Sequence, residues 1–170
     1  MQEIDEQPWT QLSEADIAQV DVIARQIHPA LPEGREVFAE KARLFPQGCF
    51  KLMFEGSMAG YAIAHPWMLH SIPPLDEFLT ALPPEPDCIY IHDVAVLSAA
   101  RGRSAAGLFI AKISDVARRM HIPHLACVSV YGTDVLWARF GFRTVVSGDI
   151  TPKLASYGEN AKYMMARVPR

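Results

Sequence analysis

Apolar side chains recur along this chain in two rhythms, one typical of helices and one typical of strands. Between residues 13 and 27 they fall three or four positions apart, at Ile17, Val20, Ile23 and Ile27, as on one face of a helix. Ser13, followed by Asp16 three residues later, resembles the start of that helix. After a break at residues 28–32, the apolar positions of 34–45 predict a second, shorter helix.

Short apolar runs typical of strands fill much of the remaining chain. They predict strands at 9–12, 49–55, 58–65, 88–97, 124–130, 142–146 and 161–168. The run at 49–55 and the run at 58–65 are separated by Gly56-Ser57, which is the spacing of a tight hairpin. Helical segments at 104–120 and 133–140 lie between the later strands, so the order predicts an α+β fold with a central strand-helix-strand crossover and no internal repeat.

Composition and charge narrow the classes of protein that this chain can belong to. Half of its 170 residues are hydrophobic, 21% are charged and the formal net charge is −3, as in an ordinary globular domain. A basic surface for nucleic acid is not indicated. The acidic start MQEIDEQPW has no apolar signal region, and no run reaches the roughly 18 apolar residues that span a bilayer. We therefore expect one domain over 1–170, in the cytoplasm and not in a membrane.

The three cysteines, Cys49, Cys88 and Cys127, lie in apolar runs without the spacing of a redox pair or a zinc site. We interpret them as free, packed thiols, because no activating group lies beside them in the sequence. The alternative is a nucleophilic cysteine. No metal is expected.

The segment from Cys88 to Gly107 carries the clearest chemical signal. A strand-like run passes without a proline into small residues and then a strongly helical segment. The first amides of a helix have no intrahelical partner and lie at its positive end, so an anion finds donors there. Small residues at such a junction also occur for packing reasons alone, and the surrounding residues decide between the two interpretations.

Three segments in order resemble the Gcn5-related N-acetyltransferase (GNAT) family. The residues Arg101, Ser104 and Ala106 match its pyrophosphate motif Gln/Arg-x-x-Gly-x-Gly/Ala, with Ser104 replacing the usual glycine. Upstream, Asp93-Val94-Ala95-Val96 resembles the family's fourth strand. Downstream, Trp137 to Phe142 resembles its Tyr-x-x-x-Gly-Phe signature. The resemblance covers Tyr90 to Arg143.

The resemblance implies a GNAT fold: a mixed, mostly antiparallel central sheet of about six to seven strands with about four helices on both faces. It implies an acetyl-CoA-dependent acyltransferase that acetylates a primary amine by direct attack on the thioester. In that family the pantetheine lies along the fourth strand and the pyrophosphate lies on the helix start. The implied cofactor-binding residues are Val94, Ala95, Val96, Arg101, Gly102, Arg103, Ser104, Ala105, Ala106 and Gly107.

A catalytic base is needed because an ammonium group has no lone pair, and a free amine has a pKa of about 10. His92 is the leading candidate, since His-x-Val-Ala-Val resembles the His-x-Leu-Ala-Val of the serotonin N-acetyltransferase branch, where the histidine serves proton removal. The alternative is a histidine with a structural hydrogen bond. Strand alternation sends His92 and Asp93 to opposite faces, which excludes a direct pair.

The proton donor for the leaving thiolate is left open by the sequence. Trp137 stands where the family has tyrosine, and its indole N–H is too weak an acid. Tyr131 is the nearest substitute, and it could instead cap the following helix. Protonation by water and direct departure of the thiolate are further alternatives.

The acceptor is the least defined part of the prediction. A loop at 66–87 carries six prolines and the acidic residues Asp76, Glu77, Glu85 and Asp87, which would attract a cationic amine or simply be solvated. A long, proline-rich loop that narrows the cleft favours a small molecule as the acceptor. A peptide or protein amine and a non-catalytic acyl-CoA sensor are the alternatives, and an apolar last strand leaves a homodimer open.

Overall fold

Seven strands form one sheet in the order β1-β2-β3-β4-β5-β7-β6 in the computed structural model, which describes residues 8–170. The strands are β1 (Trp9–Gln11), β2 (Cys49–Phe54), β3 (Ser57–Trp67), β4 (Cys88–Val96), β5 (His124–Ser129), β6 (Arg143–Thr144) and β7 (Lys162–Arg167). Only β4 and β5 run parallel. The predicted mixed, mostly antiparallel sheet is confirmed. Residues 1–7, most of the acidic start, lie outside the described residues.

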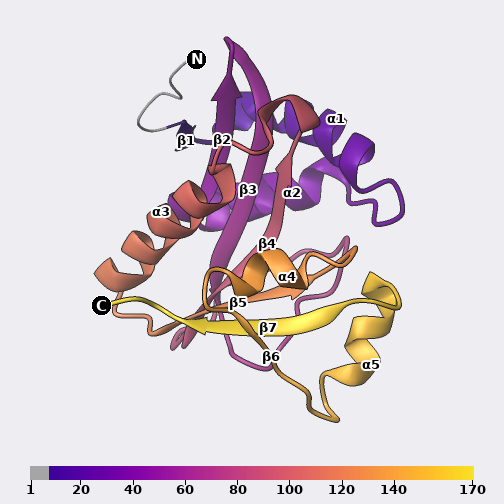
Figure 1. Cartoon of the computed structure of the whole chain (residues 1–170), viewed down its shortest axis with the longest axis vertical. Helices are drawn as coiled ribbons and strands as arrows, with labels where there is room; N and C mark the ends of the chain where they lie inside the picture. The colour runs from indigo at the N-terminus through magenta and orange to yellow at the C-terminus, as the bar shows by residue number, and fades with distance from the viewer. Residues whose placement is uncertain (1–7) are drawn as a thin grey trace.

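The helices lie on both faces of the sheet, as Figure 1 shows. They are α1 (Ile17–Ile27), α2 (Arg35–Leu44), α3 (Ala105–Arg119), α4 (Asp134–Ala138) and α5 (Thr151–Leu154). The first four match predicted segments within a few residues. The sequence did not predict α5, because four residues are too few for a helical rhythm to show.

Alternation along the strands places separate apolar clusters on the two faces of the sheet. Ile89 and Ile91 of β4 pack with Phe109 and the rest of the apolar face of α3. On the other face, Tyr61 and Ile63 of β3 pack against α1 and α2. In Figure 1, α3 lies in front of the upper strands, whereas α1 and α2 lie behind them. The two faces of β4 therefore meet different helices.

The β2–β3 hairpin turns one residue earlier than predicted. β3 begins at Ser57, so the turn consists of Glu55 and Gly56, with φ of 50° and 76°. Left-handed backbone at both central residues is the type I′ geometry that suits the twist of a hairpin. The sequence prediction had placed Ser57 in the turn.

The sheet consists of two halves that turn away from each other. β2, β3 and β4 lie roughly vertically in Figure 1, whereas β5, β7 and β6 cross below them. β4 and β5 pair only from Cys88↔His124 to Ile91↔Cys127. Beyond that point β4 follows β3 and β5 follows β7, and we call the resulting opening the V. No helix within 8–170 is long and apolar enough to cross a membrane.

Candidate functional site

Beyond Ile91, one edge of β4 has no neighbouring strand among residues 8–170. The amide of Leu97 donates to the carbonyl of Ala59 in β3 at 2.8 Å. Because backbone groups alternate along a strand, the amides of Val94 and Val96 point to the opposite side, into the V. The Val96 carbonyl accepts from Nε of Arg101 at 2.9 Å. An extended ligand can therefore pair with this edge as an added strand would.

The turn between β4 and α3 presents backbone amides at one place. Gly102 and Ser104 have φ of 74° and 60°, and α3 starts at Ala105. Within the described residues, no hydrogen bond is found for the amides of Gly102, Arg103 or Ser104. Together with the free first amides of α3, they form a concave donor surface of the kind that binds phosphate.

Two residues of this turn have structural contacts of their own. The guanidinium of Arg103 lies 4.5 Å from the centroid of the Phe54 ring, on β2. A Cβ added at Gly107 would lie 3.4 Å from the ring of Phe140, so the small residue there also allows α3 to pack near α4. The left-handed Ser104 is strained for a non-glycine residue.

A β-bulge in β4 corrects the expected orientation of His92. Ile63 pairs with Asp93 but Ala64 pairs with Ile91, so His92 has no partner of its own on β3. An extra residue at a bulge interrupts alternation. The side chains of His92 and Asp93 therefore both contact residues of the α1–α2 region and not opposite faces. Opposite faces were the wrong prediction, although the two side chains do bind different partners.

The partner of His92 is Glu33, in the loop between α1 and α2. Nε2 of His92 lies 2.8 Å from Oε1 of Glu33, and the two side chains are 1% and 5% exposed. Burial opposes the charge on Glu33, but the His92 charge and hydrogen bond outweigh it and lower the Glu33 pKa to about 2. The other ring nitrogen, Nδ1, is buried without a partner in the described chain.

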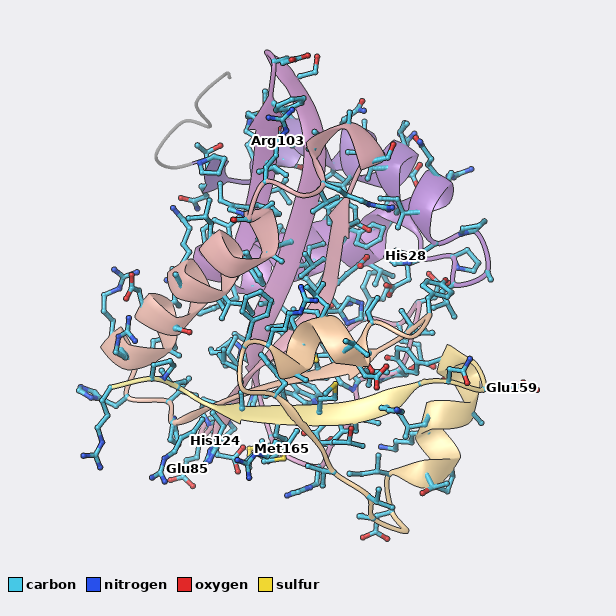
Figure 2. All side chains as sticks on the ribbon, viewed as in Figure 1. His28, Glu85, Arg103, His124, Glu159 and Met165 are labelled. Atoms are coloured by element: carbon cyan, nitrogen blue, oxygen red, sulfur yellow. The ribbon has the colours of Figure 1, made fainter. Side chains whose placement is uncertain are left out.

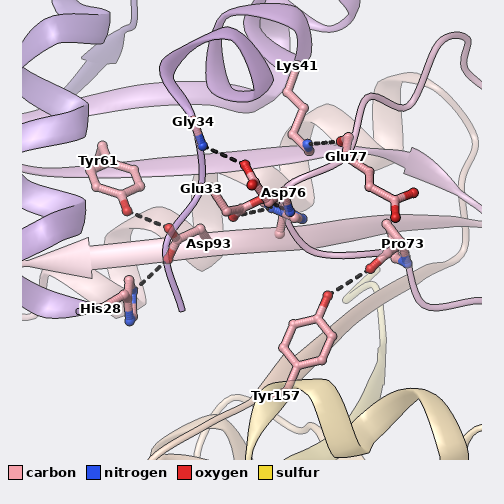
Figure 3. Close-up of polar contacts among 11 residues, drawn as sticks. His28, Glu33, Gly34, Lys41, Tyr61, Pro73, Asp76, Glu77, Asp93 and Tyr157 are labelled. Atoms are coloured by element: carbon pink, nitrogen blue, oxygen red, sulfur yellow. Dashed lines mark hydrogen bonds and ion pairs between the residues drawn. The ribbon is translucent and has the colours of Figure 1, made fainter. Parts of the chain in front are cut away.

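A second histidine–carboxylate pair lies beside the first. Nε2 of His28, the residue that ends α1, lies 2.9 Å from Oδ1 of Asp93, and the Tyr61 hydroxyl donates to the other oxygen. Figure 3 shows His28 and Tyr61 converging on Asp93, with Glu33 nearby. The side chains of His28 and Asp93 are 14% and 12% exposed. This pair is thus more open than the Glu33–His92 pair.

The charge state of His28 follows from these neighbours. Burial lowers its pKa, but the hydrogen bond and charge of Asp93, together with the Glu33 charge, raise the pKa above the ordinary value overall. The only local sign of this position in the sequence is the helix break at residue 28. Nothing in the sequence shows that α1 ends beside residue 93.

Tyr131 lies just past the end of β5, on the other side of the V from Asp93. Its ring stacks on His28 with centroids 5.8 Å apart and an interplanar angle of 17°, and 55% of the residue is exposed. Burial and the Asp93 charge raise its pKa. No helix-capping hydrogen bond from its hydroxyl occurs in the described residues. Trp137 packs edge-on against Phe142 at 5.2 Å.

The loop after β3 is held against the α1–α2 region. The amide of Asp76 donates to Glu33 and the amide of Gly34 donates to Asp76; both pairs lie at the centre of Figure 3. Glu85 lies well away from His28 in Figure 2. Asp87 accepts from the Leu69 amide inside the loop. The acidic residues therefore do not gather at one place.

The three cysteines are free and buried. Burial raises the pKa of Cys49 and of Cys88 to about 12 and also raises that of Cys127. A thiol that is protonated at neutral pH is a poor nucleophile. The interpretation as packed thiols is confirmed. Within 8–170, no three His, Cys, Asp or Glu side chains are grouped as metal ligands.

Solved structures with the same fold come from several enzyme classes. The GphF GNAT-like decarboxylase in complex with isobutyryl-CoA has a TM-score of 0.76 at 15% identity, over 95% of this chain and 99% of that one. The NatC complex bound to Gag peptide and CoA has a TM-score of 0.70 at 14% identity, over 95% and 98%. N-acetylglutamate synthase from Neisseria gonorrhoeae, complexed with coenzyme A and N-acetyl-glutamate, has a TM-score of 0.68 at 22% identity; the match covers 95% of this chain and 35% of that chain.

At these identities the structural matches show the fold alone. No curated protein matches the chain significantly. The sequence profile of the acetyltransferase (GNAT) family matches residues 11–142, a span that includes the V, the β4–α3 turn and Trp137. The fold and the acyltransferase class predicted from the sequence are confirmed, and the chain belongs to the acetyltransferase (GNAT) family.

Proposed function

We propose that this protein is an N-acetyltransferase that moves the acetyl group of acetyl-CoA to the primary amine of a small molecule by direct attack on the thioester. The observation that carries the proposal is the V, which combines along β4 an unpaired strand edge, two histidine–carboxylate pairs and, after the strand, the amides of the β4–α3 turn. Each part meets one demand of the reaction: holding the donor, holding its phosphates and moving protons.

The residues present fit acetyl-CoA as a substrate. The amides of Val94 and Val96 have the direction to bind the pantetheine, with Ala95 between them. Within residues 101–107, the amides of Gly102, Arg103 and Ser104 have no partner in the described chain, and the backbone is left-handed at Gly102 and Ser104, which suits the pyrophosphate. Ala105 and Ala106 lie at the first turn of α3, where a longer side chain would block close approach.

His92 is the proposed base, oriented by Glu33. Its Nε2 is held by the carboxylate, so Nδ1 is the nitrogen left to accept a proton. A carboxylate on one nitrogen stabilises the imidazolium that forms when the other is protonated. Because the side chain is 1% exposed, a bridging water suits proton transfer better than direct contact with the amine.

Hydrogen bonds hold the loop after β3 in place, and this favours a small acceptor. Glu40 of α2 accepts from the amides of Leu79 and Thr80 at 2.6 and 3.0 Å, and Tyr157 donates to the carbonyl of Pro73 at 2.7 Å. These contacts join the loop to both halves of the molecule. A long peptide would have to displace it, whereas a small amine would not.

The experiment pairs binding with turnover. Isothermal titration with acetyl-CoA measures donor binding, and thiol release over a panel of small amines and of short peptides measures transfer. We expect binding and preferential release with one class of small amine. Faster thiol release with peptides would indicate a peptide or protein acceptor. Binding of acetyl-CoA without thiol release with any acceptor would instead indicate an acyl-CoA sensor.

Arg103→Glu tests the placement of the pyrophosphate separately. A negative side chain in the β4–α3 turn should weaken acetyl-CoA binding by about tenfold, which corresponds to roughly 1.4 kcal/mol. Arg118→Glu, far along α3, is the matched charge control. Equal affinities of the two variants would exclude this placement.

A further inference from the structure

The proposed reaction needs a proton donor, and the family position for it is unsuitable here. Trp137 has no acidic proton, and its ring is packed on Phe142. Tyr131 is an even weaker acid than a free phenol, because burial and the charge of Asp93 raise its pKa. A departing thiolate therefore needs a donor from another part of the site.

We propose that His28, held by Asp93, is the catalytic residue that protonates the departing CoA thiolate. The inference rests on the proposed function, since it concerns the same V. It assigns a role to a residue at the end of α1 that no family motif in this sequence includes.

The geometry around His28 leaves one nitrogen for chemistry. Asp93 occupies Nε2 at 2.9 Å, and the hydroxyl of Tyr61 holds the carboxylate from its other oxygen. Tyr61 is buried in the α1–α2 core, so the carboxylate cannot easily swing away. Nδ1 is buried and has no partner within residues 8–170. A buried polar nitrogen without a partner costs free energy and is a candidate for contact with a ligand.

The position of this pair matches the opening of the V. Asp93 is the second residue of β4 beyond the last pair with β5, Ile91↔Cys127. Tyr131, two residues beyond the end of β5, contacts the His28 ring from the other side. Figure 1 shows the end of α1 lying on the side of the molecule where the two halves diverge. His28 thus contacts β4 through Asp93 and the segment after β5 through Tyr131, and the thioester is proposed to lie between these two strands.

The charges facing His28 favour its protonated form. Asp93 from β4 and Glu33 from the α1–α2 loop both favour the imidazolium, and they outweigh burial, so its pKa is raised. Other titratable groups that face this pair include the phenols of Tyr61 and Tyr131. Both are neutral at physiological pH, since their pKa values lie above the ordinary value.

The proposed step balances in atoms and electrons. The amine nitrogen forms a bond to the thioester carbonyl carbon, and the carbon–sulfur bond then breaks with its electron pair on sulfur. The proton on Nδ1 of His28 passes to that sulfur, giving CoA with a free thiol and a neutral imidazole. The proton lost by the amine passes through His92 to solvent, and His28 takes up one proton from solvent before the next cycle.

Binding of the product CoA tests the contact without any acceptor. The thiolate absorbs in the ultraviolet where the thiol does not, and desulfo-CoA provides the baseline. In a pH titration we expect the bound thiol to titrate at least about one pH unit lower in the wild type than in His28→Asn, because the imidazolium stabilises the thiolate. His121→Asn is the matched control, because His121 is exposed and has φ of 57°, which asparagine tolerates.

A second measurement needs no variant. Nuclear magnetic resonance of labelled histidine rings should show a larger rise in the His28 pKa with CoA than with desulfo-CoA. Identical thiol titration in wild type and His28→Asn, or identical His28 shifts with the two ligands, would overturn the inference. A change seen only in Tyr131→Phe would assign the donor to Tyr131 and overturn it too. If CoA does not bind the wild type at all, the proposed function itself fails.

Discussion

Neighbouring residues of one strand have different surroundings at the centre of this site. His92 is sealed against Glu33, whereas Asp93 lies in a more open position against His28. In each pair, Nε2 of the histidine contacts the carboxylate, and Nδ1 has no partner in the described chain. Direct acetyl transfer needs both removal and delivery of a proton, and two such pairs allow one residue for each.

His92→Gln tests the base at the residue scale. We expect kcat/KM for the best acceptor to fall by about 10²- to 10⁴-fold, the usual contribution of a general base, and its rise with pH to be lost. His121→Asn should keep the wild-type value and profile. An unchanged pH profile in His92→Gln would exclude His92 as the base.

His65 makes a prediction about stability and pH. It is fully buried, and burial, together with the charges of His92 and Lys41, outweighs the Pro66 carbonyl and lowers its pKa to about 3. Below pH 6.5 the unfolded chain takes up a proton here that the folded chain does not. The contribution of neutral His65 to stability is therefore lost progressively from pH 6.5 towards 3.

We expect the free energy of unfolding to fall by about 2 kcal/mol between pH 6.5 and 5 from this residue alone. Other groups are distinguishable by their windows. The lowered pKa of Glu33 contributes stability that is lost only as the pH falls below about 4.5. The raised pKa of His28 contributes stability that is lost only as the pH rises above about 6.5. Urea unfolding of His65→Phe at both pH values should show a smaller loss than the wild type. An equal loss would mean that His65 is protonated in the folded protein.

At the scale of elements, two neighbouring side chains of α2 bind the loop after β3. Glu40 is buried and accepts from two loop amides, Leu79 and Thr80. The neighbouring Lys41 is fully buried as well, and its ammonium lies 3.4 Å from the Glu77 carbonyl. The prolines of this loop restrict its backbone, but the hydrogen bonds to α2 set its position.

Glu40→Ala should release the loop. Hydrogen bonds to a charged group contribute about 1.5 to 3 kcal/mol each, so the loss of two such bonds should lower the unfolding free energy by roughly 3 kcal/mol or more. Hydrogen exchange at Leu79 and Thr80 should be faster, since their amides would lose their acceptor. Glu36→Ala, at an exposed position of the same helix, is the control. Unaltered exchange at both amides would show that the loop is held by other contacts.

At the scale of the whole molecule, the last strand completes the lower half of the sheet. β7 pairs with β5 over its full length, from His124↔Arg167 to Ser129↔Lys162, and with β6 at Met164 and Met165. The sequence leaves open a homodimer in which this apolar strand pairs across the interface. The central residues of β7 have strands on both sides within the chain, so they have no free edge for pairing with a second copy.

Removal of residues 159–170 should therefore prevent folding. The truncated chain would leave β5 and β6 without their shared neighbour and would expose the core around Tyr163 and Met164. We expect loss of the cooperative urea transition measured by circular dichroism. Removal of Arg170 alone is the control and should keep it. A cooperative transition in the longer truncation would show that the upper half folds independently.

The sequence by itself determined the order of the elements, the β4–α3 turn and the family. These features depend on local patterns: apolar rhythm, turn residues and a short motif between a strand and a helix. It also located Trp137 and Ser104 as departures from that motif. Local patterns could not place the hairpin turn to within one residue, because a turn that contains Gly56 is compatible with more than one strand register.

Only the tertiary structure decided which side chains share the site. The β4 bulge arises from the register of β3 against β4, and it brings His92 and Asp93 towards the same helices. Glu33 and His28 reach them from 59 and 65 residues away in the chain. Contacts at such separations leave no periodic trace in a single sequence, because packing between distant elements creates them.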